Sequence, residues 1–343
     1  MKISMALQYA GNPRDAADQV VELEKAGLDQ VWVAEAYGFD GVSLLGYLAA
    51  KTETVEIGAG ILNVFSRTPG AMLQTAAGLD NVSGGRAILG LGASGPQVIE
   101  GFHGMPYDKP LGRTREMIEI LRMGLRREPL VYSGKHFTLP LPEGQGLGLG
   151  KPLKLLTRPE RADLPIWIAA LGDANVALTA EVADGWLPIL FAPEHADKVW
   201  GEALAKGTAK RSADLGPLEI SAGGLVAIGD DVKGLLDFVR PHVALYVGGM
   251  GAKGKNFYNH LISSYGWEKE AAEIQELYLA GHKKEAEAKV PLELLELISL
   301  VGPESYVKER IAAFAEAGVT SLQVIPVDEN PASVISRLKE WSN

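Results

Sequence analysis

The stretch EKAGLDQVWVAE, residues 24–35, contains the end of a helix, an Ala-Gly pair and then an apolar, β-branched run of strand length. Near the C-terminus, AEAGVTSLQVIP at residues 315–326 repeats this order, and AEVADGWLPIL at residues 180–190 is a looser third copy. Glycine after a helix supplies the left-handed backbone conformation that ends it. The repeated joint therefore predicts an α/β protein in which helices turn directly into strands.

The same signals recur on both sides of these joints. Asn12 and Pro13 have the residue types of an N-cap and a first helical position, and they follow a first predicted strand. Apolar runs predict eight strands, at residues 2–8, 28–35, 55–61, 86–92, 165–170, 185–190, 218–227 and 321–325. Strands that alternate with helices pair in parallel, and eight such units predict a closed (β/α)8 TIM barrel. An open parallel sheet is the alternative.

Two stretches of the sequence lie outside the eight strand–helix units of the predicted barrel. Residues 128–164 follow strand four and contain a hairpin turn, YSGKHF, and then the Gly/Pro-rich LPLPEGQGLGLGKP. Residues 231–300 follow strand seven and have a helical pattern. We interpret both as insertions into a single domain that spans residues 1–343. Insertions after barrel strands crowd the C-terminal face, so we expect them to shape the pocket or a subunit contact.

Composition excludes several classes of function. The 343 residues include 43 acidic and 33 basic side chains, and no stripe of lysine and arginine is present, so nucleic acid is not an expected partner. No run approaches about 18 uncharged apolar residues and no leader with a cleavage site is visible, so we expect a cytoplasmic protein without membrane spans. The lack of cysteine excludes disulfides, iron–sulfur clusters and a cysteine nucleophile.

Metal and serine chemistry are not predicted either. The six histidines show neither HxxxH nor HExxH spacing, and no GxSxG sequence occurs. The segment GLGASG at residues 90–95 matches GxGxxG, but it follows the fourth strand and Pro96 interrupts the long helix of a dinucleotide-binding unit. We interpret it as a glycine-lined strand end that lets a flat or phosphorylated ligand approach the backbone. A tight turn without a ligand is the alternative.

Two further segments suit anions. Residues 169–172, AALG, precede a predicted helix whose free amides and dipole attract negative charge. Residues 248–256, GGMGAKGKN, combine four glycines with Lys253 and Lys255, which suits a phosphate or a polyanionic tail. A flexible loop is the alternative reading of the second segment.

Polar residues also follow the ends of strands two, three and four. They are Glu35, Tyr37, Asp40, Asn63, Arg67, Ser94 and Gln97. The C-terminal ends of parallel barrel strands carry the catalytic residues of TIM-barrel enzymes, so these side chains are candidates for an active-site rim. Solvated loops with an acidic N-cap are the alternative.

Longer blocks resemble the luciferase-like monooxygenase superfamily. They are RTPGAMLQTAAGLDNVSGGRAILGLGASG (67–95), LPIWIAALGDANVALTAEVADGWLP (164–188) and VGPESYVKERIAAFAEAGV (301–319). Within this superfamily the chain looks most like the branch that uses the 5-deazaflavin coenzyme F420, the methylenetetrahydromethanopterin reductase-like oxidoreductases. The phrases that carry this closer likeness are ASGPQVIEGFHG, LPEGQGLGLGKPLKL and ALYVGGMGAKGKNFYN.

The resemblance implies a homodimeric oxidoreductase with the tricyclic ring in a pocket at the C-terminal end of the barrel. The ring would lie against a bulge in strand three that contains a non-prolyl cis peptide, for which Gly60–Ile61 is the matching position. The predicted coenzyme-binding residues are Glu35, Gly60, Ile61, Asn63, Ala93, Ser94, Gln97, Ala169, Ala170, Leu171, Gly172 and Lys253. Lys253 or Lys255 is expected to hold the polyglutamate tail.

We expect a hydride to move between C5 of F420 and a small organic substrate, with Glu35, Tyr37 or His103 moving the accompanying proton. An FMN-dependent monooxygenase and a barrel that binds flavin or deazaflavin without turnover are the alternatives. Sugar-phosphate dehydrogenases of this branch carry a catalytic His after the strand-two acid and a catalytic Glu after strand four. Ala36 and Gly95 stand at these positions here, so sugar-phosphate oxidation is not expected.

Overall fold

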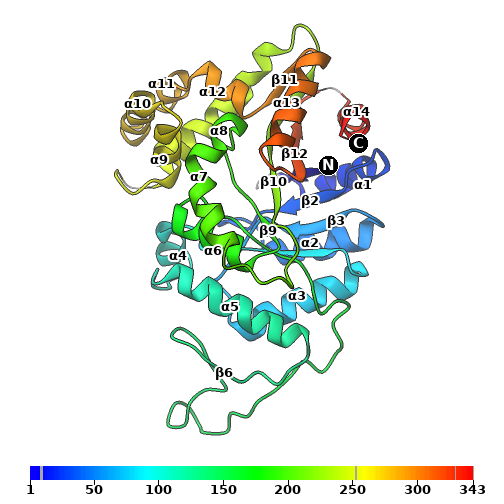
Figure 1. Ribbon diagram of the computed structural model, residues 1–343, viewed down its shortest axis with the longest axis vertical. Helices are drawn as coiled ribbons and strands as arrows, with labels where there is room; N and C mark the ends of the chain where they lie inside the picture. Colours follow the sequence, from blue (N-terminus) through cyan, green and yellow to red (C-terminus); the bar gives the residue numbers. More distant parts are fainter. Residues whose placement is uncertain (8–10, 252, 329, 343) are drawn as a thin grey trace.

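The computed structural model describes residues 1–7, 11–251, 253–328 and 330–342 (Figure 1). Parallel strands close into a ring because β12 pairs with β1 on one side and with β10 on the other. Within the described residues, the eight strands of this ring, in chain order, are β1 (Lys2–Ala6), β2 (Gln30–Val33), β3 (Glu56–Ala59), β5 (Ala87–Gly92), β8 (Ile166–Ile168), β9 (Gly185–Trp186), β10 (Glu219–Ile228) and β12 (Ser321–Pro326). The predicted closed (β/α)8 barrel is confirmed, and the open sheet is excluded.

Tryptophan side chains fill the barrel interior. Trp32 and Trp167 lie with ring centroids 5.1 Å apart and are almost fully buried with Ile88. Glycine on the neighbouring strands makes room for them, since a Cβ on Gly58 would overlap the Trp32 ring and one on Gly185 would overlap Trp167. The interior is therefore a packed floor, and a ligand can enter only at the rim.

Helices surround the barrel, as Figure 1 shows for α2, α3, α5 and α6. The helices outside the second insertion are α1 (Pro13–Lys25), α2 (Gly41–Lys51), α3 (Pro69–Ser83), α4 (Pro96–Gly101), α5 (Pro110–Leu125), α6 (Asp173–Val182), α7 (Pro193–Thr208), α13 (Glu304–Glu316) and α14 (Pro331–Trp341). Asn12 caps α1 as predicted, because its side chain accepts a hydrogen bond from Arg14 N at 3.0 Å. No helix in the described ranges combines the length and the apolar character that crossing a bilayer requires.

Both predicted insertions are present after strands four and seven. The first contains the hairpin of β6 (Tyr132–Ser133) and β7 (Thr138–Leu139), and the chain then runs without regular structure to residue 165. The second is helical and projects at the upper left of Figure 1. Its elements are η1 (Lys233–Val239), α8 (Arg240–Ala244), η2 (Leu245–Gly249), α9 (Phe257–Ser264), α10 (Glu268–Leu279), α11 (Lys283–Ala288) and α12 (Leu292–Leu297).

Most strands are shorter in the structure than predicted, and one additional strand joins the sheet. The sixth strand ends at Trp186 rather than at residue 190, and Leu190 has a positive φ that no regular strand allows. The first strand ends at Ala6, and the predicted Gln8 lies outside the described residues. An additional strand, β11 (Leu300–Gly302), pairs with the end of β10 because that strand extends beyond the ring.

Candidate active site

Strand three is interrupted where the bulge was expected. The peptide bond between Gly60 and Ile61 is cis, and the chain resumes as β4 (Leu62–Asn63), which pairs with the end of β5. A Cβ on Gly90 would overlap the carbonyl oxygen of Ala59, and one on Gly92 would lie 2.7 Å from the Ile61 side chain. These two glycines therefore make room for the bulge and not for a ligand, which corrects their interpretation from the sequence.

Gly95 differs from these two glycines. It is the N-cap of the short helix α4, and an added Cβ there would meet no protein atom within 4 Å. Ala93 and Ser94, which precede it, are half-buried and exposed, and Gln97 is exposed on the first turn of α4. The predicted binding residues after strand four thus border open space at the rim.

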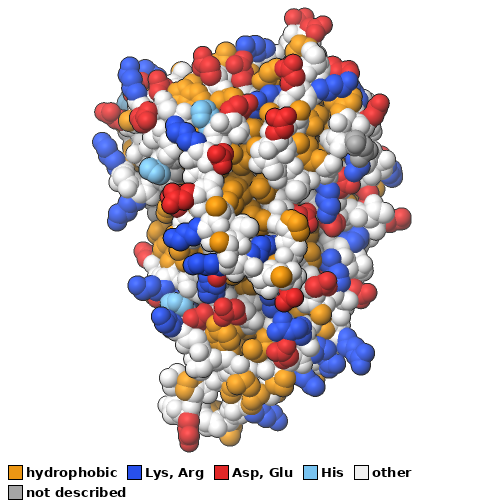
Figure 2. Space-filling view, viewed as in Figure 1, with side chains coloured by type: hydrophobic (Ala, Val, Ile, Leu, Met, Phe, Trp, Pro, Cys, Tyr) orange, Lys and Arg blue, Asp and Glu red, His pale blue; other side chains and the backbone are white. Residues whose placement is uncertain are grey.

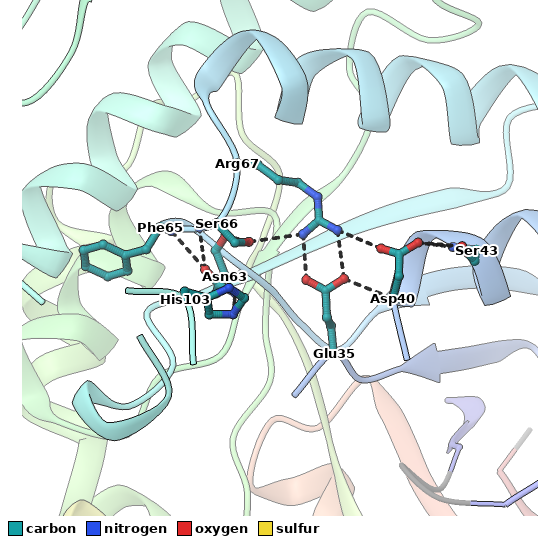
Figure 3. Close-up of polar contacts among 9 residues, drawn as sticks. Glu35, Asp40, Ser43, Asn63, Phe65, Ser66, Arg67 and His103 are labelled. Carbon is teal, nitrogen blue, oxygen red and sulfur yellow. Dashed lines mark hydrogen bonds and ion pairs between the residues drawn. The ribbon is translucent and has the colours of Figure 1, made fainter. Parts of the chain in front are cut away.

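Glu35 and Arg67 form a bidentate ion pair at the rim (Figure 3). Arg67 Nη1 donates to Glu35 Oε1 at 2.7 Å, and Arg67 Nη2 donates to Glu35 Oε2 at 2.8 Å. The side chains are only 9% and 17% exposed, and Gly41 N also donates to Glu35 Oε2 at 2.9 Å. This bidentate pair joins the end of β2 to the loop after β4.

Asp40 completes this network from the start of α2. Its Oδ2 accepts from Ser43 N at 2.9 Å and from Ser43 Oγ at 2.6 Å, and its Oδ1 accepts from Arg67 Nη2 at 3.0 Å. Burial by itself would raise the pKa of Asp40, but the hydrogen bonds from Ser43 and the charge of Arg67 outweigh it and hold this pKa below its ordinary value. Asp40 is therefore an anionic N-cap, as one reading of the sequence proposed.

Asn63 orients His103 at the opposite side of the bulge. Asn63 Oδ1 accepts from the backbone N–H groups of Phe65 at 3.1 Å and Ser66 at 2.7 Å, which turns its amide nitrogen toward His103 Nε2 at 3.3 Å. An amide nitrogen can only donate, so His103 Nε2 is the acceptor. The neutral ring then carries its proton on Nδ1, which Asn63 leaves free.

Aromatic side chains surround His103. The ring of Phe102 lies 5.2 Å from that of His103 and 6.5 Å from that of Tyr37. Tyr37 and Phe102 are both more than 60% exposed. The structure thus brings two of the predicted proton carriers, Tyr37 and His103, to one exposed aromatic cluster, whereas Glu35 is held in the separate ion pair with Arg67.

The backbone of residues 169–172 is rigidly held by indole groups. Trp186 Nε1 donates to Ala170 O, and Trp200 Nε1 donates to Leu171 O, both at 2.9 Å. The amide of Ala169 is already used, because it donates to Leu91 O at 3.0 Å. The expectation that the Ala169 amide binds the coenzyme is therefore wrong. The amides of Ala170, Leu171 and Gly172 have no acceptor among the described residues, and these three residues directly precede α6, with Gly172 as its N-cap.

Lys253 and Lys255 lie in an exposed turn that precedes α9, and neither has an ion-pair partner in the described part of the chain. Phe257 begins α9, and its ring would lie 3.3 Å from a Cβ on Gly172. This contact places the end of the lysine turn beside the free amides of residues 170–172. Two segments that suit anions in the sequence are thus neighbours in space.

A cavity of about 350 Å³ opens at the ends of β1, β2 and β12. It shares Asp40 and Gly41 with the ion-pair network of Glu35. Apolar side chains dominate its lining, among them Met5, Leu7, Val33, Phe39, Leu44, Ile325 and Val327. Asp40 is the one charged residue among the described residues that line it, and its carboxylate is already bonded to Arg67 and Ser43.

The family model described as luciferase-like monooxygenase matches residues 1–321. The chain belongs to this luciferase-like family. A Mycobacterium tuberculosis protein assigned as a coenzyme F420-dependent oxidoreductase is 41% identical over 330 residues, which are 94% of each chain. A 5,10-methylenetetrahydromethanopterin reductase of Archaeoglobus fulgidus is 28% identical over 87% of this chain and 85% of its own. The F420-dependent tetrahydromethanopterin reductase structure from Methanopyrus kandleri superposes with a TM-score of 0.80 at 22% identity, over 98% of this chain and 96% of that one.

Sequence reasoning missed part of the site of this luciferase-like protein. The cavity residues at the ends of the first and last barrel strands, Leu7 and Ile325 among them, were not predicted. Phe257 was also missed. It follows a glycine-rich loop, and the sequence of such a loop does not indicate that Phe257 packs against the distant backbone at Gly172. The ends of strands one and eight could have been found from the barrel itself, since ring closure makes them neighbours of strand two.

Proposed function

We propose that this luciferase-like protein is an F420-dependent oxidoreductase that transfers a hydride between the coenzyme and a small, neutral, mainly apolar organic substrate. The 41% identity to the mycobacterial F420-dependent oxidoreductase, along almost the whole of both chains, is the observation that carries the cofactor assignment. When bound, F420 supplies a carbon centre, C5, that accepts or donates a hydride. An FMN-dependent monooxygenase of the same fold is not favoured by any feature of the rim.

The rim residues suit a flat ring with an anionic edge. The cis Gly60–Ile61 bulge offers a backbone surface, and Gly95 leaves open space beside it. The amides of Ala170, Leu171 and Gly172, which have no acceptor among the described residues, would serve as donors for a pyrimidine edge on which reduction places negative charge. Lys253 or Lys255, which precede Phe257 in the exposed turn, would hold a polyanionic tail. Asn63, Ala93, Ser94 and Gln97 remain proposed contacts from the neighbouring strand ends.

The lining of the 350 Å³ cavity supports a neutral substrate. A phosphate or carboxylate group there would meet no described cation, and the one carboxylate is occupied by Arg67. Burying an unpaired charge in apolar surroundings is costly, so a charged substrate would bind weakly. Ala36, which lines the cavity, adds no titratable group to it. A ketone, an alcohol or another polar group on an apolar skeleton fits these surroundings.

We propose His103 as the proton carrier, with Tyr37 as its neighbour at the mouth of the site. Asn63 leaves the Nδ1 proton of His103 available to a substrate oxygen. Glu35 is assigned a positioning role instead, because both of its oxygens accept hydrogen bonds from Arg67 and one also accepts from Gly41. The barrel and its insertions share one hydrophobic core, which supports a single domain.

Fluorescence titration of the purified protein with F420 and with FMN tests the cofactor. We expect F420 to bind tightly and FMN weakly; tight binding of FMN without binding of F420 would reject the proposal. Oxidation of reduced F420 is then followed with neutral cyclic ketones and with phosphorylated sugars of similar size. Turnover confined to the neutral compounds supports the substrate class, and turnover confined to the phosphorylated ones contradicts it.

A further inference from the structure

The short helix α4 carries proposed site residues but is weakly held by the core. Gln97 lies on its first turn, and His103 follows it with its backbone N–H donating to Val98 O at 3.1 Å. The helix has six residues, all described, and of these Ile99 alone is buried. It lies at the left edge of Figure 1, where Figure 2 shows hydrophobic side chains at the surface among charged ones. Since isolated helices shorter than about 12 residues are marginal, contacts from outside must fix its position.

The chain enters α4 through an unfavourable backbone conformation. Ser94 has a φ of 57°, in the left-handed region that residues with a Cβ rarely adopt. Its side chain is exposed, so packing of that side chain does not hold the conformation. Conformations of this kind persist where the surrounding structure holds them. The neighbours of the Ser94 backbone therefore decide how the chain reaches α4.

Tyr107 contacts both ends of this helix. Its hydroxyl donates to Ser94 O at 3.3 Å, just before α4, and its backbone N–H donates to Oε1 of Glu100 at 3.2 Å, in the last turn. Burial raises the pKa of the Tyr107 phenol above its ordinary value of 10.0, so the hydroxyl keeps its proton at neutral pH. One residue thus ties the segment before α4 and the end of α4 together.

The Tyr107 ring is itself fixed on the rim. It stacks on the Phe65 ring, with the centroids 5.2 Å apart and 29° between the planes. Phe65 is 7% exposed, and the Arg113 guanidinium lies 5.5 Å from its ring centroid. The backbone N–H of Phe65 donates to Asn63, the residue that also orients His103 (Figure 3). Tyr107 therefore joins the loop after β4 to the loop after β5.

We propose that Tyr107 is a positioning residue of the active site, whose hydroxyl holds Ser94 in the left-handed conformation and thereby places α4. The inference rests on the proposed function, in which Ser94 and Gln97 contact the coenzyme and His103 carries the proton. Tyr107 acts through the backbone of residues 94–103 and is not assigned a contact with coenzyme or substrate. Loss of its hydroxyl should therefore weaken coenzyme binding without removing any group that touches the coenzyme.

Tyr107→Phe removes the hydroxyl and keeps the stacked ring. We expect it to raise the F420 dissociation constant, measured by fluorescence titration, by about fivefold. Tyr306→Phe is the matched control, because Tyr306 is also half-buried and its hydroxyl also donates to a backbone carbonyl, Glu296 O at 3.4 Å. The control should bind F420 as the wild type does. Equal dissociation constants for the wild type and Tyr107→Phe would overturn the proposal.

A change at Ser94 separates positioning from a general structural role. Asparagine visits the left-handed conformation more readily than other residues with a Cβ. In a Ser94→Asn background, Tyr107→Phe should therefore change the F420 dissociation constant by less than about twofold. Because both proteins of this comparison carry Asn at position 94, any contact of Ser94 itself with the coenzyme cancels. A loss of about fivefold in both backgrounds would contradict the assigned route through Ser94.

Amide hydrogen exchange tests the same contact without coenzyme. The backbone N–H groups of Phe102 and His103 both donate to Val98 O, and their exchange reports on the end of α4. Tyr107→Phe should speed this exchange by at least about threefold, and Tyr306→Phe should leave it unchanged. Faster exchange in a protein whose wild type binds no F420 would reject the proposed function but support the placement of α4 by Tyr107. Unchanged exchange in Tyr107→Phe, with F420 bound by the wild type, would overturn this inference alone.

Discussion

Glu35 was predicted to act as a proton carrier at the rim, but in the folded chain it forms an ion pair with Arg67. Glu35 follows β2 and was a candidate acid, yet both of its carboxylate oxygens accept from the Arg67 guanidinium. Because the pair is largely buried, removal of either side chain would leave the charge of the other without a partner, at a cost in folding free energy. The pair therefore holds the loops after β2 and β4 together at the mouth of the proposed site.

We expect Glu35→Gln and Arg67→Met each to lower the free energy of unfolding by about 2–4 kcal/mol, because each leaves a partly buried polar partner unpaired. The double variant should be less destabilised than the sum of the two, by at least about 1 kcal/mol, since the residues act as one unit. Urea unfolding of the wild type and the three variants measures this coupling. Additive effects would contradict a shared role.

Two glycines, Gly90 within β5 and Gly95 just after it, predict a contrast. Gly90→Ala should destabilise the fold by about 3 kcal/mol or more, because the new Cβ overlaps the carbonyl oxygen of Ala59 and the backbone must shift. Gly95→Ala is the matched control and should change stability by less than about 0.5 kcal/mol, because it meets open space. Thermal unfolding compares the two. If F420 lies beside Gly95, this second variant should weaken coenzyme binding while it folds normally.

Helix α5 anchors the hairpin of β6 and β7 through one carboxylate. Glu116 accepts hydrogen bonds from the backbone N–H groups of Lys135 at 2.7 Å and of His136 and Phe137 at 2.9 Å. Burial alone would raise the pKa of Glu116, but these three bonds favour the charged form and hold the pKa below its ordinary value of 4.5. The base of the first insertion is therefore tied to the barrel helices by a buried anion.

This anchor predicts a pH dependence of stability. A pKa that is lower in the folded state stabilises the fold above pH 4.5, and the contribution is lost as the pH falls through the folded value. Glu116→Gln should therefore lower the free energy of unfolding by about 1–3 kcal/mol at pH 7, and the difference from wild type should shrink as the pH drops below 4.5. Urea unfolding of the wild type and the variant at pH 7 and at a pH below 4.5 measures this difference. Glu143→Gln, an exposed position in the first insertion, should show neither effect.

At the scale of the whole molecule, the second insertion contacts the barrel rim through Phe257, which lies against Gly172 and follows the turn of Lys253 and Lys255. If the polyglutamate tail of F420 crosses this region, K253E/K255E should raise the F420 dissociation constant by about tenfold at low salt and weaken its dependence on ionic strength. Fluorescence titration at several salt concentrations measures both. K269E/K284E carries the same change of net charge and should bind F420 as the wild type does. Unaltered affinity of K253E/K255E would place the tail elsewhere.

The fold was predictable because its signals are local. The joint at residues 24–35 and its copy at 315–326 each end a helix with glycine, and Gly27 and Gly318 have the positive φ that this requires. Alternation of such units leaves few topologies, and the right-handed connection of parallel strands selects the barrel. Strand ends were less accurate: Trp186 ends a strand that the apolar run continued, because burial and strand formation produce the same pattern.

By itself, then, the sequence determined the order of strands and helices and the two insertions, because residues near one another in the chain encode them. The place of the bulge at Gly60–Ile61 followed from the resemblance to the luciferase-like family. Only the tertiary structure decided that Arg67 donates hydrogen bonds to both oxygens of Glu35 and that the Ala169 amide donates to Leu91 O. It also decided that Phe257, which follows the lysine turn, lies against Gly172. These contacts join residues far apart in the chain. They depend on barrel register and loop packing, which no local pattern records.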